Sequence, residues 1–300
     1  MVGITCIVAA TDLSAAGDRA VRRSAQLTSS VGGALKFIHV LPPRDVLADL
    51  FPSQTDKEIA ALRARAGAAL QDRVQLAAAS FAVTPSWTLF HGRAHRAILD
   101  AVGEFQADLV VVGAQGEREA ASSSATLGET AFKLAQQSQV PVLLVRREPK
   151  EPYHAVVACA KGEQIDTRVI EWADRLSPDS LLHIVSAYKV PYEERLREWG
   201  ASESSIDLYA TREREDRTRR LGSTLSELRM PAARARLHVE RGVPLQLILN
   251  TAAQFSADLV ILGRRPPPDP LGGGAFGSVA RAVAVLAPMD VLIVPPQMAT

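Results

Sequence analysis

Short apolar runs alternate with longer amphipathic stretches along the whole chain. In the first half, helical patterns fill residues 15–30, 54–80, 94–106 and 127–137, and apolar runs cover residues 4–10, 34–41, 85–89, 109–112 and 140–145. Continuously apolar runs are typical of strands buried on both faces, and a helix between successive strands favours a parallel sheet. The first half is therefore predicted to be an open five-stranded α/β sheet with helices on both faces.

The second half follows the same plan. Its helical patterns fill residues 164–176, 245–255 and 277–287, one or two charged helices fall within 188–229, and its apolar runs cover residues 155–160, 181–185, 234–240, 259–262 and 290–294. This pattern predicts a second parallel sheet of five strands.

One stretch occurs twice. Phe105-Gln106-Ala107-Asp108-Leu109-Val110-Val111-Val112-Gly113 returns 150 positions later as Phe255-Ser256-Ala257-Asp258-Leu259-Val260-Ile261-Leu262-Gly263. The offset is half of the 300 residues, so the chain is predicted to contain two copies of one domain in tandem. We place the first domain at residues 1–147, a charged linker with prolines at 148–152, and a diverged second domain at 153–300.

Composition excludes several classes of protein. The net charge of +1 gives no field that would attract nucleic acid, and no apolar run approaches the roughly 20 residues of a membrane span. The chain starts without the pattern of a signal peptide, so we expect a cytoplasmic protein. Cys6 and Cys159 lie in the first apolar run of each half and are interpreted as buried free thiols. The run 211–220 mixes charges and is interpreted as a solvated helix face.

The loop after the fourth strand is the first candidate site in each half. Open α/β sheets bind ligands beyond the carboxyl ends of their strands, where the strand order reverses. A glycine-rich loop that leads into a helix offers unpaired N–H groups and the positive end of a helix dipole. Both halves have such a loop, at residues 113–125 and 263–277, and this pattern favours a phosphate group.

The whole plan resembles a known family. Each half resembles a universal stress protein domain, and the chain resembles a tandem member of that family. The residues that carry the resemblance are Ala10-Thr11-Asp12, His39-Val40, 107–113 and 140–145 in the first half, and 182–184, 257–263, Gly277-Ser278 and 291–294 in the second. The resemblance implies two open sheets of the adenine nucleotide alpha hydrolase type in a pseudo-two-fold arrangement.

The family's ATP-binding members share a pattern that the first half matches in part. The pattern reads Gly, two residues, Gly, nine residues, Gly, then Ser or Thr. In these members an aspartate at the end of strand one contacts the sugar, and the backbone after strand two lines the base. By this resemblance the nucleotide site comprises Thr11, Asp12, Val40, Gly113, Gly116 and Gly128. Eleven residues separate Gly116 from Gly128, and Glu129 stands where a hydroxyl is expected. A carboxylate beside a polyphosphate is repulsive. Ser122, Ser123, Ser124, Thr126 or Thr130 could supply the missing donor.

The second half departs differently from the pattern. Its weaker candidate site is Gly263, Arg264, Gly277 and Ser278, with Pro266 in place of the second glycine. Lys161 replaces the strand-one aspartate. Arg264 and Arg265 could bind phosphates, although solvated turn residues are the favoured interpretation.

Other candidate sites are weaker. His91 and His95 have the spacing of metal ligands on a helix, but Gly92 follows His91 and no other ligand completes a shell, so we expect no metal site. His39 and His183, which stand in matching second strands, are interpreted as histidines at the edge of the core. No acid–base pair predicts an enzyme, and slow ATP hydrolysis is the most that is expected.

The resemblance therefore implies a stress-response binding or signalling module that could bind ATP, with Mg²⁺, through its first half. The alternatives are an interaction protein with degenerate sites and a binder of another anionic or lipidic metabolite. An unidentified protein is the expected partner, with no nucleic acid and no membrane. The closing strands 140–145 and 291–294 could pair within the chain as a pseudo-dimer, and a homodimer remains open.

Overall fold

The computed structural model describes residues 3–43, 46, 56–115, 126–265 and 276–296. The chain divides into two compact units. The first contains residues 1–152 together with 264–276 and 284–298, and the second contains 153–263 and 277–283. In this division, residues 284–296 belong with the first unit although they follow the second in sequence.

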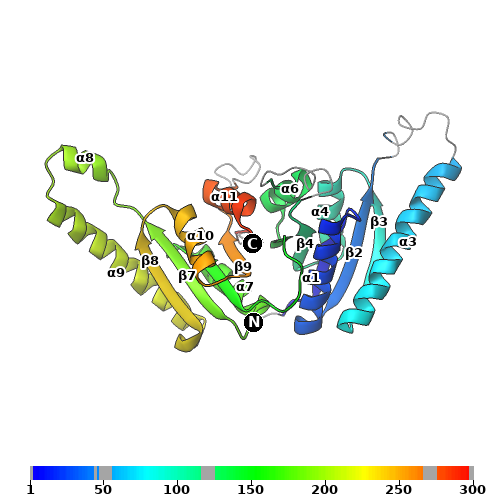
Figure 1. The fold of residues 1–300 in the computed structure, drawn as a ribbon, viewed down its shortest axis with the longest axis horizontal. Coiled ribbons are helices and arrows are strands. Elements are labelled where there is room, and N and C mark those ends of the chain that lie inside the picture. The colour runs from blue at the N-terminus through cyan, green and yellow to red at the C-terminus, as the bar shows by residue number, and fades with distance from the viewer. Residues whose placement is uncertain (1–2, 44–45, 47–55, 116–125, 266–275, 297–300) are drawn as a thin grey trace. The chain divides into compact units, whose positions relative to one another are not determined.

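Five parallel strands form the sheet of the first unit (Figure 1). They are β1 (Cys6–Ala10), β2 (Ala34–Leu41), β3 (Ser86–His91), β4 (Leu109–Gly113) and β5 (Val142–Val145), in the order β3-β2-β1-β4-β5. The order reverses between β1 and β4, so the carboxyl ends of these two strands flank the switch point at which such sheets bind ligands.

Helices cover both faces of this sheet. α1 (Ala15–Val31) and α3 (Asp56–Phe81) pack on one face, and α4 (Ala94–Glu104) and α6 (Glu129–Gln137) on the other. The four residues Leu109, Val110, Val111 and Val112 are all buried, as expected of a strand covered on both sides. Ser14 caps α1 by accepting the N–H of Gly17 at 3.2 Å.

A sixth strand, β10 (Asp290–Val294), lies antiparallel to β5. Val291, Leu292 and Ile293 align with Leu144, Leu143 and Val142, so the two closing strands predicted to pair are paired. Pairing covers the edge of β5 that would otherwise be free.

Asp290 anchors β10 to the first unit. Its carboxylate is fully buried and accepts hydrogen bonds from Nε of Arg23 at 3.2 Å and from the N–H groups of Arg146 and Arg147 at 2.8 and 3.0 Å. Arg23 also donates to the carbonyl of Glu151 at 3.0 Å. Buried charges require such partners, and these bonds explain why the end of the chain clusters with its beginning.

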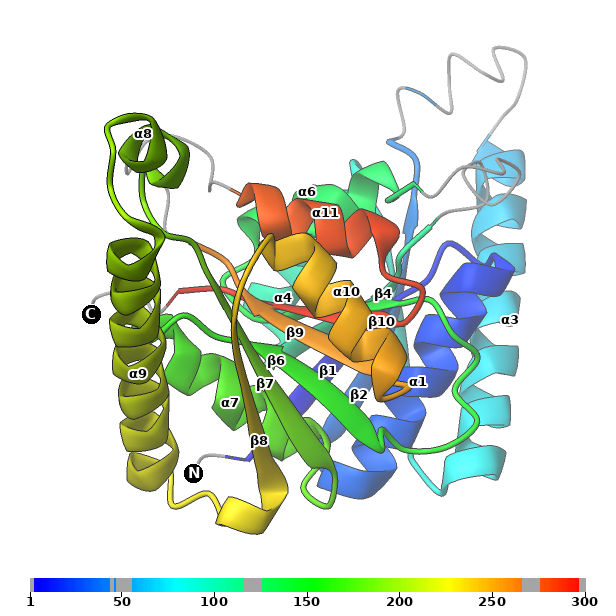
Figure 2. The same ribbon diagram turned by 60° about the vertical axis from the view of Figure 1, so that its left-hand side comes forward.

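Four parallel strands form the sheet of the second unit, seen most openly in Figure 2. They are β6 (Ala155–Cys159), β7 (Leu181–Tyr188), β8 (Ala235–Arg241) and β9 (Leu259–Gly263), in the order β9-β6-β7-β8. α7 (Ile165–Leu176) and α9 (Glu203–Glu227) pack on one face, and α10 (Pro244–Gln254) on the other. α11 (Ser278–Leu286) follows β9.

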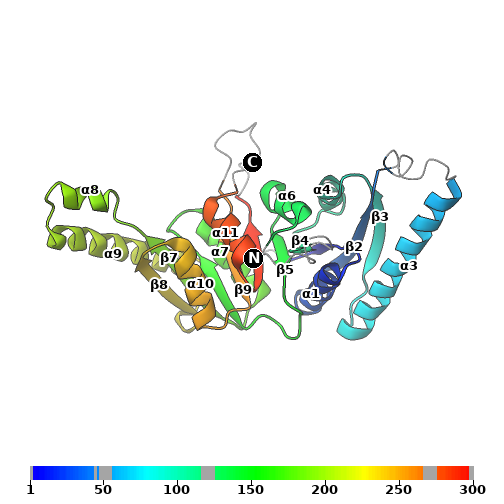
Figure 3. The same ribbon diagram turned by 45° about the horizontal axis from the view of Figure 1, so that its top comes forward.

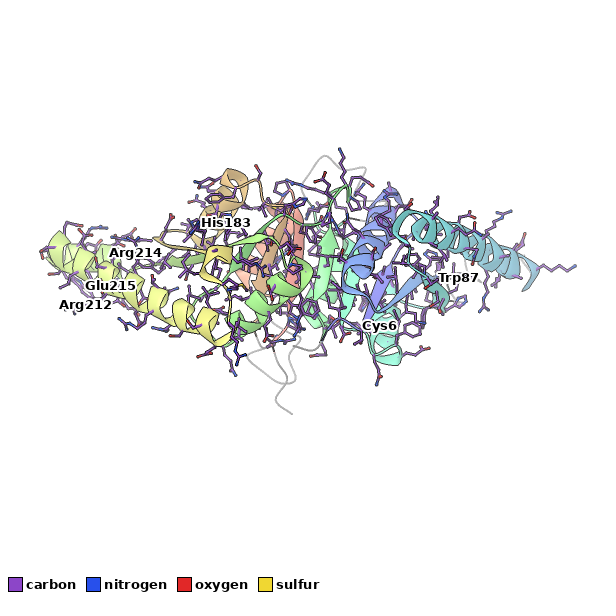
Figure 4. All side chains as sticks on the ribbon, turned by 90° about the horizontal axis from the view of Figure 1, so that it is seen from below. Cys6, Trp87, His183, Arg212, Arg214 and Glu215 are labelled. Carbon is purple, nitrogen blue, oxygen red and sulfur yellow. The ribbon has the colours of Figure 1, made fainter. Side chains whose placement is uncertain are left out.

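The charged region predicted to hold one or two helices holds two, α8 (Glu193–Glu198) and α9 (Figure 3). They are separated at Gly200, whose φ of +84° suits glycine, and α9 begins at the cap Ser202. Arg212, Arg214 and Glu215 are exposed on α9 (Figure 4), in agreement with the predicted solvated face.

The repeated aspartates have a structural role. Oδ2 of Asp108 accepts hydrogen bonds from the N–H and Oγ1 of Thr5 at 2.6 and 2.7 Å, and Asp258 accepts the N–H of His154 at 2.8 Å. Each aspartate thus ties the start of its fourth strand to the start of the first strand.

Cys6 is a buried free thiol, as predicted, whereas the free thiol Cys159 is half-buried, and burial raises the pKa of both. Within the described ranges, every helix is too short or too polar to span a lipid bilayer.

Candidate functional site

A pocket of about 350 Å³ lies at the carboxyl ends of β1, β2 and β4, beside the switch point. α6 begins at the same edge of the sheet (Figure 1). The pocket brings together five of the six residues predicted for the first half, namely Thr11, Asp12, Val40, Gly113 and Gly128. The sixth, Gly116, lies outside the described residues, as do Ser122, Ser123 and Ser124.

The strand-one end presents a carboxylate to this pocket. Oδ1 of Asp12 accepts hydrogen bonds from the N–H of Ser14 at 3.1 Å and from its hydroxyl. Oδ2 forms no hydrogen bond with the described residues, and the side chain is exposed. Ser14 is itself the cap of α1, so the start of the helix fixes the orientation of the carboxylate.

Gly17 leaves room for this arrangement. A Cβ atom at Gly17 would lie 2.4 Å from Oγ1 of Thr11 and 2.7 Å from Oδ1 of Asp12. Both distances are far below van der Waals contact, so any larger residue would displace the end of strand one.

His39 lies in the pocket beside Val40, at the end of β2. Its Nδ1 donates a hydrogen bond to the carbonyl oxygen of Thr11 at 2.8 Å, because a carbonyl can only accept. The interpretation of His39 as a histidine at the edge of the core was therefore incomplete. The sequence offered no signal of the contact with Thr11, since it joins two strands 28 residues apart.

Packing alone requires a glycine at position 113. A Cβ atom there would lie 2.9 Å from the carbonyl oxygen of Ala16, so a glycine lets β4 approach α1. Gly263 has the same role against α7, where a Cβ atom would lie 2.6 Å from Cγ1 of Ile165. The repeated glycine turn is thus explained in both units without a ligand.

The N-terminus of α6 supplies the hydrogen-bond donors of the pocket. Gly128 is the N-cap, and its own N–H donates to the carbonyl of Ala114 at 2.9 Å, which leaves it unavailable to a phosphate. Glu129, Thr130 and Ala131 line the pocket as the first helical residues. Their N–H groups precede the first intrahelical bond, so this end of the helix carries a partial positive charge.

Glu129 adds a negative charge at the same place. Its carboxylate pairs with Nζ of Lys133, one turn along α6, at 2.5 Å. The hydrogen bond from Lys133 lowers the pKa of Glu129, so the carboxylate is ionised at neutral pH. The helix starts at Glu129, two residues later than predicted, and this shift places the acid in its first turn.

His95 follows Ala94, which lines the pocket from α4. Burial, followed by the positive charges of Lys133 and Arg96, lowers the pKa of His95. Two of the hydroxyls predicted as substitute donors lie among the described residues. Thr130 lines the pocket, whereas Oγ1 of Thr126 is buried without a hydrogen-bond partner among the described residues.

In the second unit, the loop after the first strand, which corresponds to residues 11–14 of the first unit, binds a carboxylate of the chain itself. The side chain of Asp166 is buried and accepts the N–H groups of Lys161, Gly162 and Glu163 at 2.7, 2.6 and 2.8 Å. Burial raises the pKa of Asp166. Backbone N–H groups that converge in this way form an anion site, and here the anion belongs to the chain.

Arg264 contradicts both interpretations made from the sequence. It is neither solvated nor free to meet a phosphate, because it is 5% exposed and donates from Nη2 to the carbonyl of Ser138 at 2.7 Å. Burial lowers its pKa. Its N–H also bonds to Val294 at 2.7 Å, so the residue holds β10 within the first unit. Of the other predicted residues, Gly277 precedes α11 and Ser278 is exposed at its first position.

The pairing of His39 with His183 is also wrong. Ala10 aligns with Ile38, and Cys159 aligns with Val185, so the residue that corresponds to His39 is Ser186. His183 stands earlier in β7, where its Nδ1 lies 3.0 Å from Nε2 of His238 and its ring stacks on Phe255. Near the carboxyl end of the second strand, the first unit therefore has a histidine and the second unit has a serine.

In the described part of the chain, no three His, Cys, Asp or Glu side chains are grouped as metal ligands. His91 ends β3 and His95 lies in α4, so the two do not share a helix.

Comparisons with known proteins agree with the fold. The sequence model of the universal stress protein family matches residues 4–146 and again residues 152–295. A search of curated proteins finds no match.

Among solved structures, a protein of Archaeoglobus fulgidus described as a universal stress protein has a TM-score of 0.69 and 15% identity, and covers 97% of this chain and 98% of its own. A Pseudomonas aeruginosa protein with the same description has a TM-score of 0.66 and 19% identity, and covers 98% of this chain and 94% of its own. A universal stress protein solved in complex with cAMP covers 48% of this chain and 98% of its own, at 21% identity and a TM-score of 0.35.

Proposed function

Since the chain belongs to the universal stress protein family, as a tandem member with two such domains, we propose that it is a binding module whose first unit takes one adenine nucleotide. The second unit, in this proposal, takes none. The module would act through binding, as a response element read by a protein partner.

The proposal is carried by one observation, the division of the pocket into two chemical ends. The N–H groups of the first turn of α6 lie at one end, and hydrogen-bond acceptors lie at the ends of β1 and β2. An anion fits the first end and a group rich in N–H or O–H donors fits the second. A nucleotide has both, since its phosphate is joined to a ribose and a base.

The size and place of the pocket support the same class of ligand. A volume of about 350 Å³ falls within the range of small-molecule sites. The switch point between β1 and β4 is where open α/β sheets bind nucleotides. If ATP is bound, Mg²⁺ would enter mainly on the phosphates and water. Asp12 and Glu129 are the carboxylates of the lining that could reach it.

The second unit lacks the features that support binding in the first. Lys161 stands in place of Asp12, and Ser186 in place of His39. Neither the carboxylate of Asp12 nor the imidazole of His39 therefore has a counterpart at the strand ends of the second unit. The proposal therefore assigns the site to the first unit.

Thermal unfolding with and without ATP and Mg²⁺ tests the proposal on the full chain. Saturation at about a hundredfold over the dissociation constant stabilises a protein by roughly 2.7 kcal/mol. We expect such a shift in the wild type, its loss in Asp12→Ala, and its retention in Lys161→Ala, the matching position of the second unit. No shift in the wild type at millimolar ATP would refute the proposal, and a shift lost only in Lys161→Ala would move the site.

A further inference from the structure

We propose that Nε2 of His39 selects the nucleobase, as a hydrogen-bond acceptor for an amino group at the far end of the pocket. The inference rests on the proposed function, which already assigns an adenine nucleotide, and adds the side chain that distinguishes the base. It makes His39 a specificity-determining residue, and the ligand an amino-substituted purine nucleotide rather than its keto counterpart.

The first step is the tautomer of His39. Nδ1 lies 2.8 Å from the carbonyl oxygen of Thr11, and a carbonyl oxygen has no proton to give. Nδ1 therefore carries the hydrogen, and in the neutral ring Nε2 carries a lone pair. The bond to Thr11 also fixes the plane of the ring over the end of β1, so the lone pair has one direction.

The second step is that this lone pair is available. Nε2 forms no hydrogen bond with the described residues, and the half-buried ring is part of the pocket lining. Oδ2 of Asp12, in the turn that follows β1, also forms no hydrogen bond there. Two acceptors without donors among the described residues thus belong to the lining of one pocket, and a ligand that binds there must bring the donors.

The third step orients the ligand. The strands run in the order β2-β1-β4, and α6 follows β4. A phosphate at the N-terminus of α6 therefore lies at one end of the pocket, and a molecule extended from it passes Asp12, just after β1, before it reaches His39 in β2. For a nucleotide this sequence is phosphate, ribose and base. Asp12 meets hydroxyl groups, and His39 meets the edge of the base.

The fourth step distinguishes the bases. An amino group on a purine ring donates to a lone pair, whereas a carbonyl oxygen at the same position places two lone pairs against each other. The keto purine loses the hydrogen bond and also leaves two acceptors without a donor. Leaving a polar group unpaired costs more free energy than the bond itself contributes. One hydrogen bond in a partly open pocket supports a preference of about tenfold.

The experiment measures dissociation constants by isothermal titration calorimetry for the full chain. The probes are adenosine 5′-monophosphate, inosine 5′-monophosphate and the 5′-monophosphate of purine riboside, which differ only in having an amino group, an oxygen or a hydrogen at position 6. We expect the amino compound to bind about ten times more tightly than the keto compound, with the unsubstituted one between them.

The matched variant is His39→Asn. The asparagine amide can still donate to the carbonyl of Thr11 from the position of Nδ1, but it has no atom at Nε2. We expect it to unfold at the wild-type temperature and to bind the three probes with equal affinity. His39→Gln, which can place an amide oxygen near Nε2, should keep the preference if His39→Asn fails to fold.

The outcomes separate the inference from the proposed function. If the wild type binds the keto nucleotide as tightly as the amino nucleotide, or if the preference survives in a folded His39→Asn, the inference is wrong and nucleotide binding stands. If no probe binds to the wild type at millimolar concentration, nucleotide binding at this pocket is wrong and the inference fails with it.

Discussion

Glu129 and Ser278 occupy the same position in the two units, as the first residue of the helix that follows the fourth strand. The N–H of Phe132 donates to the carbonyl of Gly128, and the N–H of Arg281 donates to that of Gly277, both at 2.9 Å. The two helix starts are therefore aligned residue for residue. One presents a carboxylate where the other presents a hydroxyl.

Replacing Glu129 by its counterpart should improve the binding of polyphosphates. In Glu129→Ser the repulsion between carboxylate and phosphate is removed, while the helix N–H groups remain. We expect the affinity for ATP without Mg²⁺ to rise by about tenfold, the equivalent of about 1.4 kcal/mol, and that for adenosine to stay the same. Calorimetric titration of both ligands measures this difference.

Lys133→Gln is the control for this prediction. It leaves Glu129 without the ion pair that partly neutralises it, so ATP should bind more weakly than to the wild type. If Glu129→Ser instead weakens ATP binding when Mg²⁺ is present, Glu129 is a metal ligand and the repulsion argument is wrong.

Gly17→Ala should disturb the site at the end of strand one. Its Cβ atom would lie within 2.7 Å of both Thr11 and Asp12, and overpacking of this kind costs about 1–3 kcal/mol. We expect lower stability in urea and a loss of nucleotide binding. Gly103→Ala, in α4, meets nothing within 4 Å and should stabilise the protein by about 0.5–1 kcal/mol. Equal effects of the two substitutions would contradict the packing described for Gly17.

Asp290→Asn should be among the most damaging substitutions. It leaves Arg23, which is 4% exposed, without the carboxylate that neutralises it, and breaking a buried ion pair costs about 3–5 kcal/mol. Glu148→Gln removes the exposed ion pair to Arg22 and should cost less than about 1 kcal/mol. Urea unfolding compares them. Similar losses would show that β10 is not held by Asp290.

The histidine pair of the second unit should make β7 sensitive to pH. Burial, followed by the charges of His238 and Arg236, lowers the pKa of His183, and burial lowers that of His238. A histidine with a lowered pKa stabilises the folded state when neutral. This contribution is complete above about pH 6.5, the ordinary value, and is lost as the pH falls through the lower pKa of the folded protein.

Hydrogen exchange of residues 181–188 measures this effect. Protection should fall between pH 7.5 and 5.5 after correction for intrinsic rates, and the fall should be smaller in His183→Phe, which retains the stacking on Phe255. A fall of the same size in both proteins would assign the pH dependence to other groups.

The architecture could be predicted from the sequence because its signals are local and occur twice. The continuous burial of Leu109 to Val112 and the twin stretch at Leu259 determine strand type, sheet class and domain repeat together. The site was predicted in part. Asp12 follows a strand, Val40 lies near the end of one and Gly128 caps a helix, so the topology alone brings them to one edge of the sheet.

What the sequence could not predict depends on contacts between distant residues. Arg264 follows a glycine turn like a surface residue, but its partner is the carbonyl of Ser138, 126 positions away. His39 and His183 both stand in the second strand of their unit and so seem equivalent in sequence. The register of the paired strands shows that Ser186, and not His183, corresponds to His39. The bonds that fill the loop of the second unit with Asp166 had no motif to indicate them.

The stoichiometry of nucleotide binding tests the central claim most directly. Calorimetric titration of the full chain with adenosine 5′-monophosphate should give one site per chain, because Asp12 and His39 line the pocket of the first unit, whereas Lys161 and Ser186 stand at these positions in the second. The same titration of Asp12→Ala should show no binding. Two sites per chain, or one site that survives in Asp12→Ala, would contradict the account.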